Sequence, residues 1–232
     1  MTTLLQIDAS SRITRSISRS LTNKFTEQWL NIRSDDKVIK RDVGKNPPPA
    51  IDEAWIDAAF TAVEKRTREQ ETALKISDEL LAELEVADLI IIGAPMYNYG
   101  MPSALKAWID QVIRINCTFS FDLARGDRPI EPLLTGKILV ILCSSGEGGF
   151  ELGGVRAAMN HLDPHIVTVS SLFGVSKHYV VRVEYQEFND ERHQKSLASA
   201  NRAISKLVQQ LTQQVEDRTC YDETAINTNK EK

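Results

Sequence analysis

The segment Asp88–Ala107, DLIIIGAPMYNYGMPSALKA, constrains the fold more than any other part of this chain. Four consecutive apolar β-formers, Leu89–Ile92, end at a glycine, and a polar, aromatic turn then leads into a helix that begins near Pro102. A buried strand that ends in a loop before a helix is the place where open α/β sheets bind ligands. The tyrosines and the asparagine of the turn predict a site that holds a flat ring and hydrogen-bonds its edge.

Strand-like and helix-like segments alternate along the 232 residues, which predicts a parallel five-stranded sheet with helices on both faces. Right-handed crossovers leave two common doubly wound strand orders for such a sheet. The fourth strand is fully apolar and is therefore expected at the centre. The predicted strands are Thr3–Asp8, Lys37–Val43, Asp88–Ala94, Lys137–Cys143 and Tyr179–Glu184.

Apolar residues at helical spacing predict the segments between these strands. The segment Phe119–Leu134 has too many polar and turn residues for a regular element, and the polar tail from residue 216 to 232 is expected to be disordered. Residues 1–215 are therefore expected to form a single domain. The predicted helices are Ser16–Arg33, Asp52–Arg68, Thr72–Val86, Pro102–Ile115, a broken helix over Val155–Phe173, and Asn189–Val215.

Three polar loops follow the first, third and fourth strands, and in a 2-1-3-4-5 order these strands are neighbours. The first loop, Asp8–Ser18, is rich in hydroxyl groups and opens a helix, so it predicts a phosphate cradle. Ser16 alone is equally well explained as an N-cap. The third loop, Ser144–Gly149, carries small residues that let the backbone approach a ligand closely.

The loops lack both GxxxxGK[ST] and GxGxxG, which disfavours an ATP site and a Rossmann-type dinucleotide site. One phosphate cradle beside one site for a flat polar heterocycle describes flavin mononucleotide (FMN) better than a dinucleotide. The sequence thus predicts an FMN site at the edge where the three loops meet.

Composition narrows the class of protein further. The net charge of −4 and the absence of a basic cluster predict no nucleic-acid or membrane partner. The three cysteines are far apart, and the pair His161 and His165 is interrupted by Asp163-Pro164, so no metal site is predicted. The beginning of the chain has no signal-peptide pattern, and no apolar run approaches the ~20 residues of a spanning helix. A cytoplasmic protein with reduced thiols, including a buried Cys143, is expected.

The runs Ala94–Tyr99 and Pro102–Asp110 (PSALKAWID) resemble the FMN-dependent NADH-azoreductases, which are flavodoxin-like quinone reductases. The resemblance extends from Leu4 to about Leu211 and implies a flavodoxin-like fold with strand order 2-1-3-4-5. By match to the family pattern, the residues implied to hold FMN are Ser10, Ser16, Ile17, Ser18, Met96, Tyr97, Asn98, Tyr99, Ser144, Ser145, Gly146 and Glu147.

The match in the loop after the fourth strand, Ser144–Glu147, departs from the family pattern, which is nearer S-R-G-G. Ser145 stands where that arginine is usual, and Glu147 adds a negative charge near the expected position of the ring. The flavin potential or the nicotinamide preference is therefore expected to differ from that of the family.

The resemblance also implies the reaction. NADH, or NADPH, passes a hydride to FMN, and a quinone or an azo compound then receives two electrons in a ping-pong cycle, so that no side chain is expected to be catalytic. A homodimer is implied as well, with Phe119–Leu134, Leu172 and Phe173 as candidates to line the partner's pocket or simply to pack at the surface. Two other classes stay open, a flavodoxin-type electron carrier without small-molecule turnover and a flavin-binding sensor.

Overall fold

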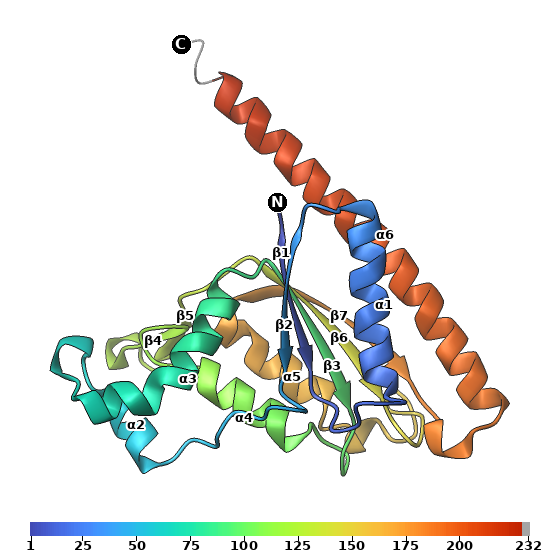
Figure 1. Ribbon diagram of the computed structural model, residues 1–232, viewed down its shortest axis with the longest axis horizontal. Helices are drawn as coiled ribbons and strands as arrows, with labels where there is room; N and C mark the ends of the chain where they lie inside the picture. The colour runs from blue at the N-terminus through green and yellow to red at the C-terminus, as the bar shows by residue number, and fades with distance from the viewer. Residues whose placement is uncertain (229–232) are drawn as a thin grey trace.

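The computed structural model describes the backbone of residues 1–228 and the side chains of residues 1–217 (Figure 1). A sheet of five parallel strands forms its centre, and these strands are β1 (Thr3–Asp8), β2 (Lys37–Asp42), β3 (Leu89–Pro95), β6 (Lys137–Ser144) and β7 (Val175–Val183). Their spatial order is β2-β1-β3-β6-β7. This is the predicted 2-1-3-4-5 order, so the flavodoxin-like fold class is confirmed.

Helices cover both faces of the sheet (Figure 1). Two of them pack on one face and three on the other, while a short sixth helix lies at the periphery, where it packs on α3 and donates a hydrogen bond from Trp55 to Gln111 of α4. On the first face lie α1 (Ile17–Ile32) and α6 (Glu191–Thr228); on the second lie α3 (Arg68–Glu85), α4 (Ser103–Val112) and α5 (Asp163–Ser170); the peripheral helix is α2 (Glu53–Phe60).

The core is divided between these two faces by the two-residue period of the strands. In β3, Ile90 and Ile92 pack on the side of α3 and α4, whereas Leu89 and Ile91 pack on the side of α1 and α6. All four side chains are buried, because both neighbours of β3 are strands and both of its faces carry helices. This is why the sequence of the strand is an uninterrupted apolar run.

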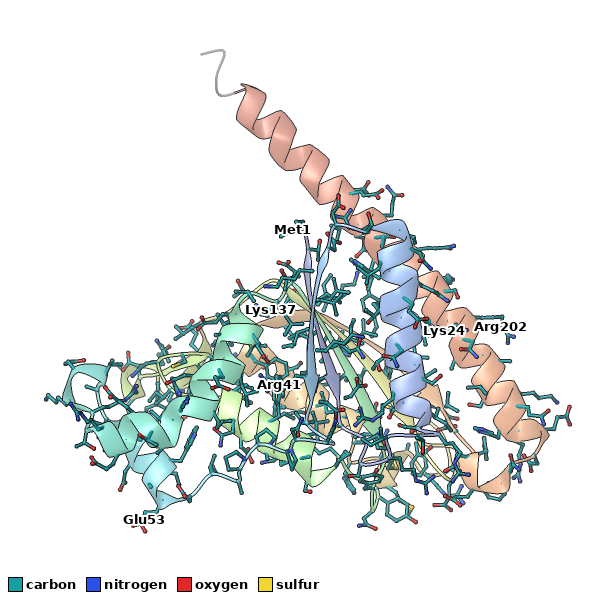
Figure 2. The ribbon with its side chains drawn as sticks, in the orientation of Figure 1. Met1, Lys24, Arg41, Glu53, Lys137 and Arg202 are labelled. Carbon is teal, nitrogen blue, oxygen red and sulfur yellow. The ribbon has the colours of Figure 1, made fainter. Side chains whose placement is uncertain are left out.

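At the amino ends of the strands, two charged side chains are buried and form hydrogen bonds with nearby groups. The buried carboxylate of Asp36 accepts from the Thr2 N–H at 2.7 Å and from the Trp29 indole at 3.0 Å. Lys137, labelled in Figure 2, is also buried, and its Nζ donates to the carbonyls of Glu85 at 3.0 Å and Ala87 at 2.6 Å. Asp36 and Lys137 therefore have their hydrogen-bond partners within the protein and are not presented to a ligand.

Two expectations for secondary structure were wrong. The segment Phe119–Leu134 contains an antiparallel pair of short strands, β4 (Phe119–Phe121) and β5 (Ile130–Pro132), because each pairs with the other outside the main sheet. The predicted broken helix over Val155–Phe173 is α-helical only in α5, with single 3₁₀ turns before and after it.

Several boundaries also differ from the predicted ones. The predicted helix Asp52–Arg68 stops at Phe60, and α3 starts at Arg68 after a capping box on Thr67. Strand β7 begins at Val175 because it pairs along the whole of β6. Helix α6 continues beyond the expected end at Val215 to Thr228, in a stretch without glycine or proline, while residues 229–232 of the predicted tail lie outside the described residues. Among the helices described, none is long and apolar enough to cross a membrane.

Candidate functional site

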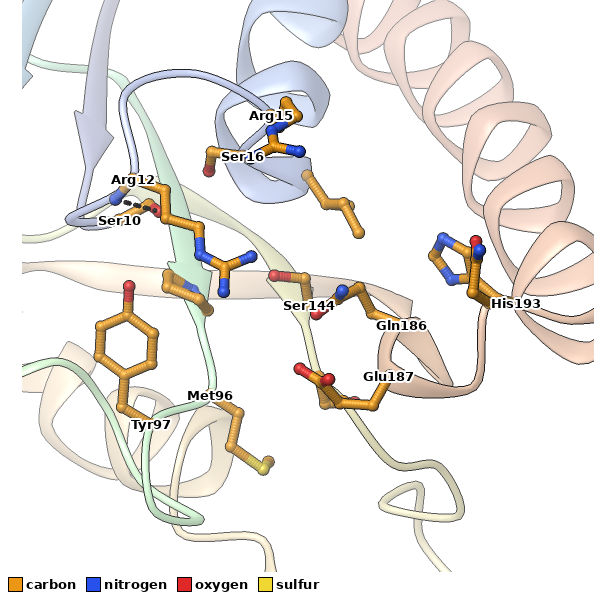
Figure 3. Close-up of a pocket in the computed structure, with 15 residues that line it drawn as sticks. Ser10, Arg12, Arg15, Ser16, Met96, Tyr97, Ser144, Gln186, Glu187 and His193 are labelled. Atoms are coloured by element: carbon orange, nitrogen blue, oxygen red, sulfur yellow. Dashed lines mark hydrogen bonds between the residues drawn. The ribbon is translucent and has the colours of Figure 1, made fainter.

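A cavity of about 590 Å³ lies at the carboxyl ends of β1, β3, β6 and β7, within the range of small-molecule and cofactor pockets (Figure 3). Its lining confirms that the three predicted loops meet at one edge of the sheet. Of the predicted site residues, the structure brings together Ser10, Ser16, Ile17, Met96, Tyr97, Ser144, Ser145 and Gly146. The further lining residues are Arg12, Arg15, Pro95, Gln186, Glu187, Asn189 and His193.

The amino end of α1 forms one wall of the cavity. Ser16 is the N-cap of this helix, and its Oγ accepts from the Arg19 N–H at 3.4 Å and lies 3.4 Å from the Oγ of the buried Ser18. The first N–H groups of an α-helix have no partner within the helix and attract anions. The capping interpretation and the phosphate-cradle interpretation of Ser16 therefore describe the same helix end.

The loop before α1 is fixed by a single guanidinium group. Arg19 donates to the Ser10 carbonyl at 2.6 Å and to the Arg12 carbonyl at 2.9 Å, and it pairs in a bidentate manner with Asp42 of β2 at 2.6 Å. Burial would raise the pKa of Asp42, but the hydrogen bonds from Arg19 and the Lys45 N–H, together with the positive charges of both residues, outweigh burial and lower the pKa. The charged pair thus fastens two carbonyls of the loop to the neighbouring strand.

The loop after β3 presents Met96 and Tyr97 to the cavity and turns away behind them. Tyr97 and Gly100 exchange two backbone hydrogen bonds at 3.0 Å, and Asn98 and Tyr99 between them have positive φ angles of 49° and 64°. Asn98 and Tyr99 therefore form the tip of a tight turn outside the cavity lining. Their contact with a cofactor stays a prediction, as does that of Ser18.

In the loop after β6, one predicted site residue lines the cavity and another is turned away from it, as in the loop after β3. Ser145 is buried, and its Oγ donates to the Glu147 carbonyl at 2.7 Å. The Glu147 carboxylate accepts from the Tyr99 hydroxyl at 3.2 Å and forms an ion pair with Arg156 at 3.1 Å. Glu147 is consequently engaged with protein groups and does not line the cavity.

The segment that follows β7 was not predicted to belong to the site, yet Gln186, Glu187 and Asn189 line the cavity. Its backbone is joined to the β6 loop by three hydrogen bonds of 3.1 Å, from the N–H groups of Tyr185, Gln186 and Glu187 to the carbonyls of residues 147, 145 and 146. The available signal was the position of this segment after a strand, since the carboxyl ends of all parallel strands meet at one edge. Arg12 and Arg15 lie within a loop that was already singled out, where they are the only cations before α1.

Other candidate chemistry is not supported by the geometry. Cys143 is buried as expected, and burial raises the pKa of its thiol far above the ordinary value, which makes it inert. In the part of the chain that the structure describes, no group of three His, Cys, Asp or Glu side chains is placed to hold a metal ion.

Comparisons with known proteins agree with this geometry. Residues 2–208 match the family model described as the flavodoxin-like fold. The chain is 53% identical to FMN-dependent NADH:quinone oxidoreductase 2 of Colwellia psychrerythraea, over 91% of this chain and all of that protein. It is 40% identical to FMN-dependent NAD(P)H:quinone oxidoreductase 1 of Pseudomonas aeruginosa, over 88% of this chain and all of that protein.

Solved structures show the same fold at lower identity. An azoreductase from Bacillus anthracis is 21% identical and superposes with a TM-score of 0.79, over 90% of this chain and 99% of that one. An FMN-dependent NADH-azoreductase from the same species, solved in complex with FMN, is 19% identical with a TM-score of 0.79, over 91% and 99% of the two chains. The chain therefore belongs to the family of the flavodoxin-like fold, together with the proteins named FMN-dependent NADH:quinone oxidoreductase.

Proposed function

We propose that this chain is an FMN-dependent oxidoreductase that takes a hydride from NADH, or from NADPH, and reduces quinones by two electrons. Reductive cleavage of aromatic azo compounds is included in the proposal, since the structural relatives carry that name. The observation that carries the proposal is the full-length similarity to a protein named for the quinone reaction, in a chain whose four strand ends enclose one cavity.

The residues of the cavity fit FMN in size and in donor chemistry. The amino end of α1 offers donors and positive charge to a phosphate group through the hydroxyls of Ser10 and Ser16 and the guanidinium groups of Arg12 and Arg15. Ser18, buried behind Ser16 with its Oγ at 3.4 Å from the Ser16 Oγ, would support this group. Ile17 would contribute its backbone N–H to the same group.

The opposite part of the cavity would hold the ring. Met96 and Tyr97 supply an apolar and an aromatic surface, with Asn98 and Tyr99 behind them, and Ser144 and Ser145 supply polar groups. The backbone at Gly146, which lines the cavity, and at Glu147 would meet the ring edge. Residue 146 is a glycine because a Cβ there would lie 2.6 Å from Glu187 Cγ.

When bound, FMN supplies the two-electron chemistry, and the protein contributes position and electrostatics. Backbone N–H groups near Asn98 and Gly146 would stabilise negative charge at the ring edge. Hydride transfer needs no side-chain acid or base, so we assign no catalytic residue. The donor and the acceptor would use the same open side of the cavity in turn.

Anaerobic addition of NADH to the FMN-loaded protein tests the proposal. The visible flavin band is expected to bleach rapidly and to return when a quinone or an azo dye is added. A flavin band that NADH leaves oxidised would instead support the flavodoxin-type carrier or the sensor, which require no turnover of small molecules. Absence of FMN binding would overturn the assignment of the site.

We further infer a cytoplasmic homodimer in which residues 1–215 form the FMN-binding domain. The short strands β4 and β5 support an interface, because Phe121, Leu123 and Ile130 are apolar and exposed there. Phe173 is not available for this role, since it is buried against Trp108 with ring centroids 5.9 Å apart. Sedimentation velocity of the full chain is expected to give the mass of two chains, and a single-chain mass would contradict the inference.

A further inference from the structure

The cavity contains a carboxylate, that of Glu187, beside the loop that follows β6. The Glu187 N–H donates to the Gly146 carbonyl at 3.1 Å. A Cβ built on Gly146 would lie 2.6 Å from Glu187 Cγ and 3.6 Å from Cδ. The side chain thus packs directly on the backbone that is proposed to meet the ring, and Figure 3 shows it entering the cavity.

Glu147, which stands nearby in the sequence of the β6 loop, has a different environment. Its two oxygens are engaged by the Tyr99 hydroxyl at 3.2 Å and by Arg156 at 3.1 Å. For Glu187, no ion pair or side-chain hydrogen bond is formed with any residue among those described. Of these two acids, Glu187 therefore contributes an uncompensated negative charge to the cavity, whereas the charge of Glu147 is balanced by Arg156.

The charges of the cavity are separated along its length. Arg12 and Arg15 belong to the loop before α1, and Figure 3 shows Arg12 and Glu187 entering from opposite sides. The only other ionisable side chains of the lining are Tyr97 and His193, and His193 Nδ1 lies 3.1 Å from the Glu184 carbonyl. The positive end thus matches the phosphate of the cofactor, and the negative charge lies at the end of the ring.

We propose that Glu187 sets the balance between the oxidised and the reduced cofactor in this site. NADH transfers a hydride, which is two electrons and one proton, and becomes NAD⁺. The reduced ring carries one additional negative charge until it takes a proton from solvent. The Glu187 carboxylate repels this charge, disfavours the reduced form and makes the bound cofactor a stronger reductant. The inference rests on the proposed function.

The experiment compares the wild-type protein with Glu187→Gln, Glu187→Lys and the matched control Asp190→Asn, because Asp190 is an acid of the same segment that is paired with Arg192 at 2.6 Å and lies outside the cavity lining. Fluorescence titration gives the dissociation constant of oxidised FMN, and equilibration with redox dyes under anaerobic conditions gives the two-electron potential of the bound FMN. Together they yield the ratio of the dissociation constants of oxidised and reduced FMN for each variant. Neither measurement depends on turnover.

Glu187→Gln is expected to raise this ratio by about tenfold, which corresponds to an increase in potential of about 30 mV. Glu187→Lys is expected to raise it further, because the charge changes by two. Asp190→Asn is expected to change the ratio by less than about threefold, since that carboxylate is already paired with Arg192 at the surface.

Two results would overturn the inference. If the wild-type protein binds FMN and the Glu187 variants leave the ratio where Asp190→Asn leaves it, Glu187 has no such role, although the proposed function stands. If the wild-type protein binds no FMN at all, the proposed function fails, and the inference fails with it.

Discussion

The two ends of the central sheet differ in how their charged groups are used. At the amino ends of the strands, Asp36 and Lys137 are buried, and each forms several hydrogen bonds with the backbone or with neighbouring side chains. At the carboxyl ends, Arg12, Arg15 and Glu187 are exposed in a cavity.

This difference teaches which charges stabilise the fold and which are available to a ligand. A buried charge is tolerated only when hydrogen bonds replace its lost hydration. An exposed charge that forms no internal pair adds little to stability but can interact with a ligand that displaces water from the cavity. Variants at the amino end should therefore change the free energy of unfolding, and variants at the carboxyl end should mainly change cofactor binding.

The largest effect is expected for Asp36→Ala at the amino end. This change leaves the Thr2 N–H and the Trp29 indole without an acceptor, so the free energy of unfolding should fall by about 3 kcal/mol. Urea unfolding measured by far-UV circular dichroism tests the value. A loss below about 1 kcal/mol, typical of an exposed site, would show that Asp36 is not held by hydrogen bonds within the protein as described.

The same variant has a pH signature. Burial alone would raise the pKa of Asp36, but hydrogen bonds from Arg33, Thr2 and Trp29 outweigh it and lower the pKa. A carboxylate with a lowered folded-state pKa stabilises the protein above its unfolded-state pKa, near pH 4, and this stabilisation is lost as the pH falls through the folded-state pKa. The difference between wild type and Asp36→Ala should therefore shrink below about pH 4. A difference that grows on acidification would contradict the assignment.

Lys137→Met is expected to have the next largest effect. It keeps an apolar stem of similar length but removes the ammonium that donates to the carbonyls of Glu85 and Ala87. Because two buried carbonyls lose their donor, the free energy of unfolding should fall by about 2 kcal/mol. The dissociation constant of FMN, measured by fluorescence titration of the folded variant, should stay at the wild-type value. A weaker affinity would contradict the proposal that charged groups at the amino ends of the strands affect stability but not cofactor binding.

Arg19→Gln tests the carboxyl end, where the effect should appear in binding. The change releases the carbonyls of Ser10 and Arg12 from Asp42, so the loop before α1 loses its fixed position. The dissociation constant of FMN should rise by about tenfold, equivalent to about 1.4 kcal/mol. The matched control is Arg41→Gln, which breaks the ion pair with Glu83 away from the cavity and should leave FMN affinity unchanged. Equal effects of the two variants would rule out a special role for Arg19.

The smallest effect is expected for Ser16→Ala compared with Thr67→Ala. Both residues cap a helix, α1 and α3 respectively, so each variant should lose about 1 kcal/mol of stability. Ser16→Ala alone should also weaken FMN binding, by about threefold, because only its hydroxyl faces the cavity. Thermal unfolding and fluorescence titration of both variants would show whether Ser16 only caps α1 or also binds the cofactor. Unchanged FMN affinity in Ser16→Ala would leave Ser16 as a cap only.

Much of the site was predictable because strand ends of a parallel sheet meet at one edge. The runs Leu89–Ile92 and Lys137–Cys143 are apolar without interruption, which places both strands in the middle of the sheet and their loops side by side. The loops that contain Ser10, Ser16, Met96, Tyr97 and Gly146 follow from that rule, and the family resemblance identified these residues within the loops. The residues after β7 obey the same rule, but nothing in their composition distinguishes them from an ordinary connection.

The direction of each side chain was not predictable. Asn98, Tyr99 and Glu147 lie in the predicted loops, yet the tight turn at Tyr97–Gly100 and the pairing of Glu147 with Arg156 remove them from the cavity lining. These outcomes depend on backbone torsions and on partners distant in the sequence. The pairing of β4 with β5 was missed for a related reason, since three-residue strands give too little pattern to identify.

The sequence by itself determined the fold class and the edge at which the polar loops meet, because apolar periodicity and chain order control burial and crossover direction. The 2-1-3-4-5 strand order was one of two that the pattern allowed, and the family resemblance selected it. Only the tertiary structure decided which charges are paired and which line the cavity, because pairing depends on backbone torsions and on distances between side chains of different segments. Glu147 and Glu187 show this most clearly, since one is neutralised by Arg156 and the other lies in the cavity.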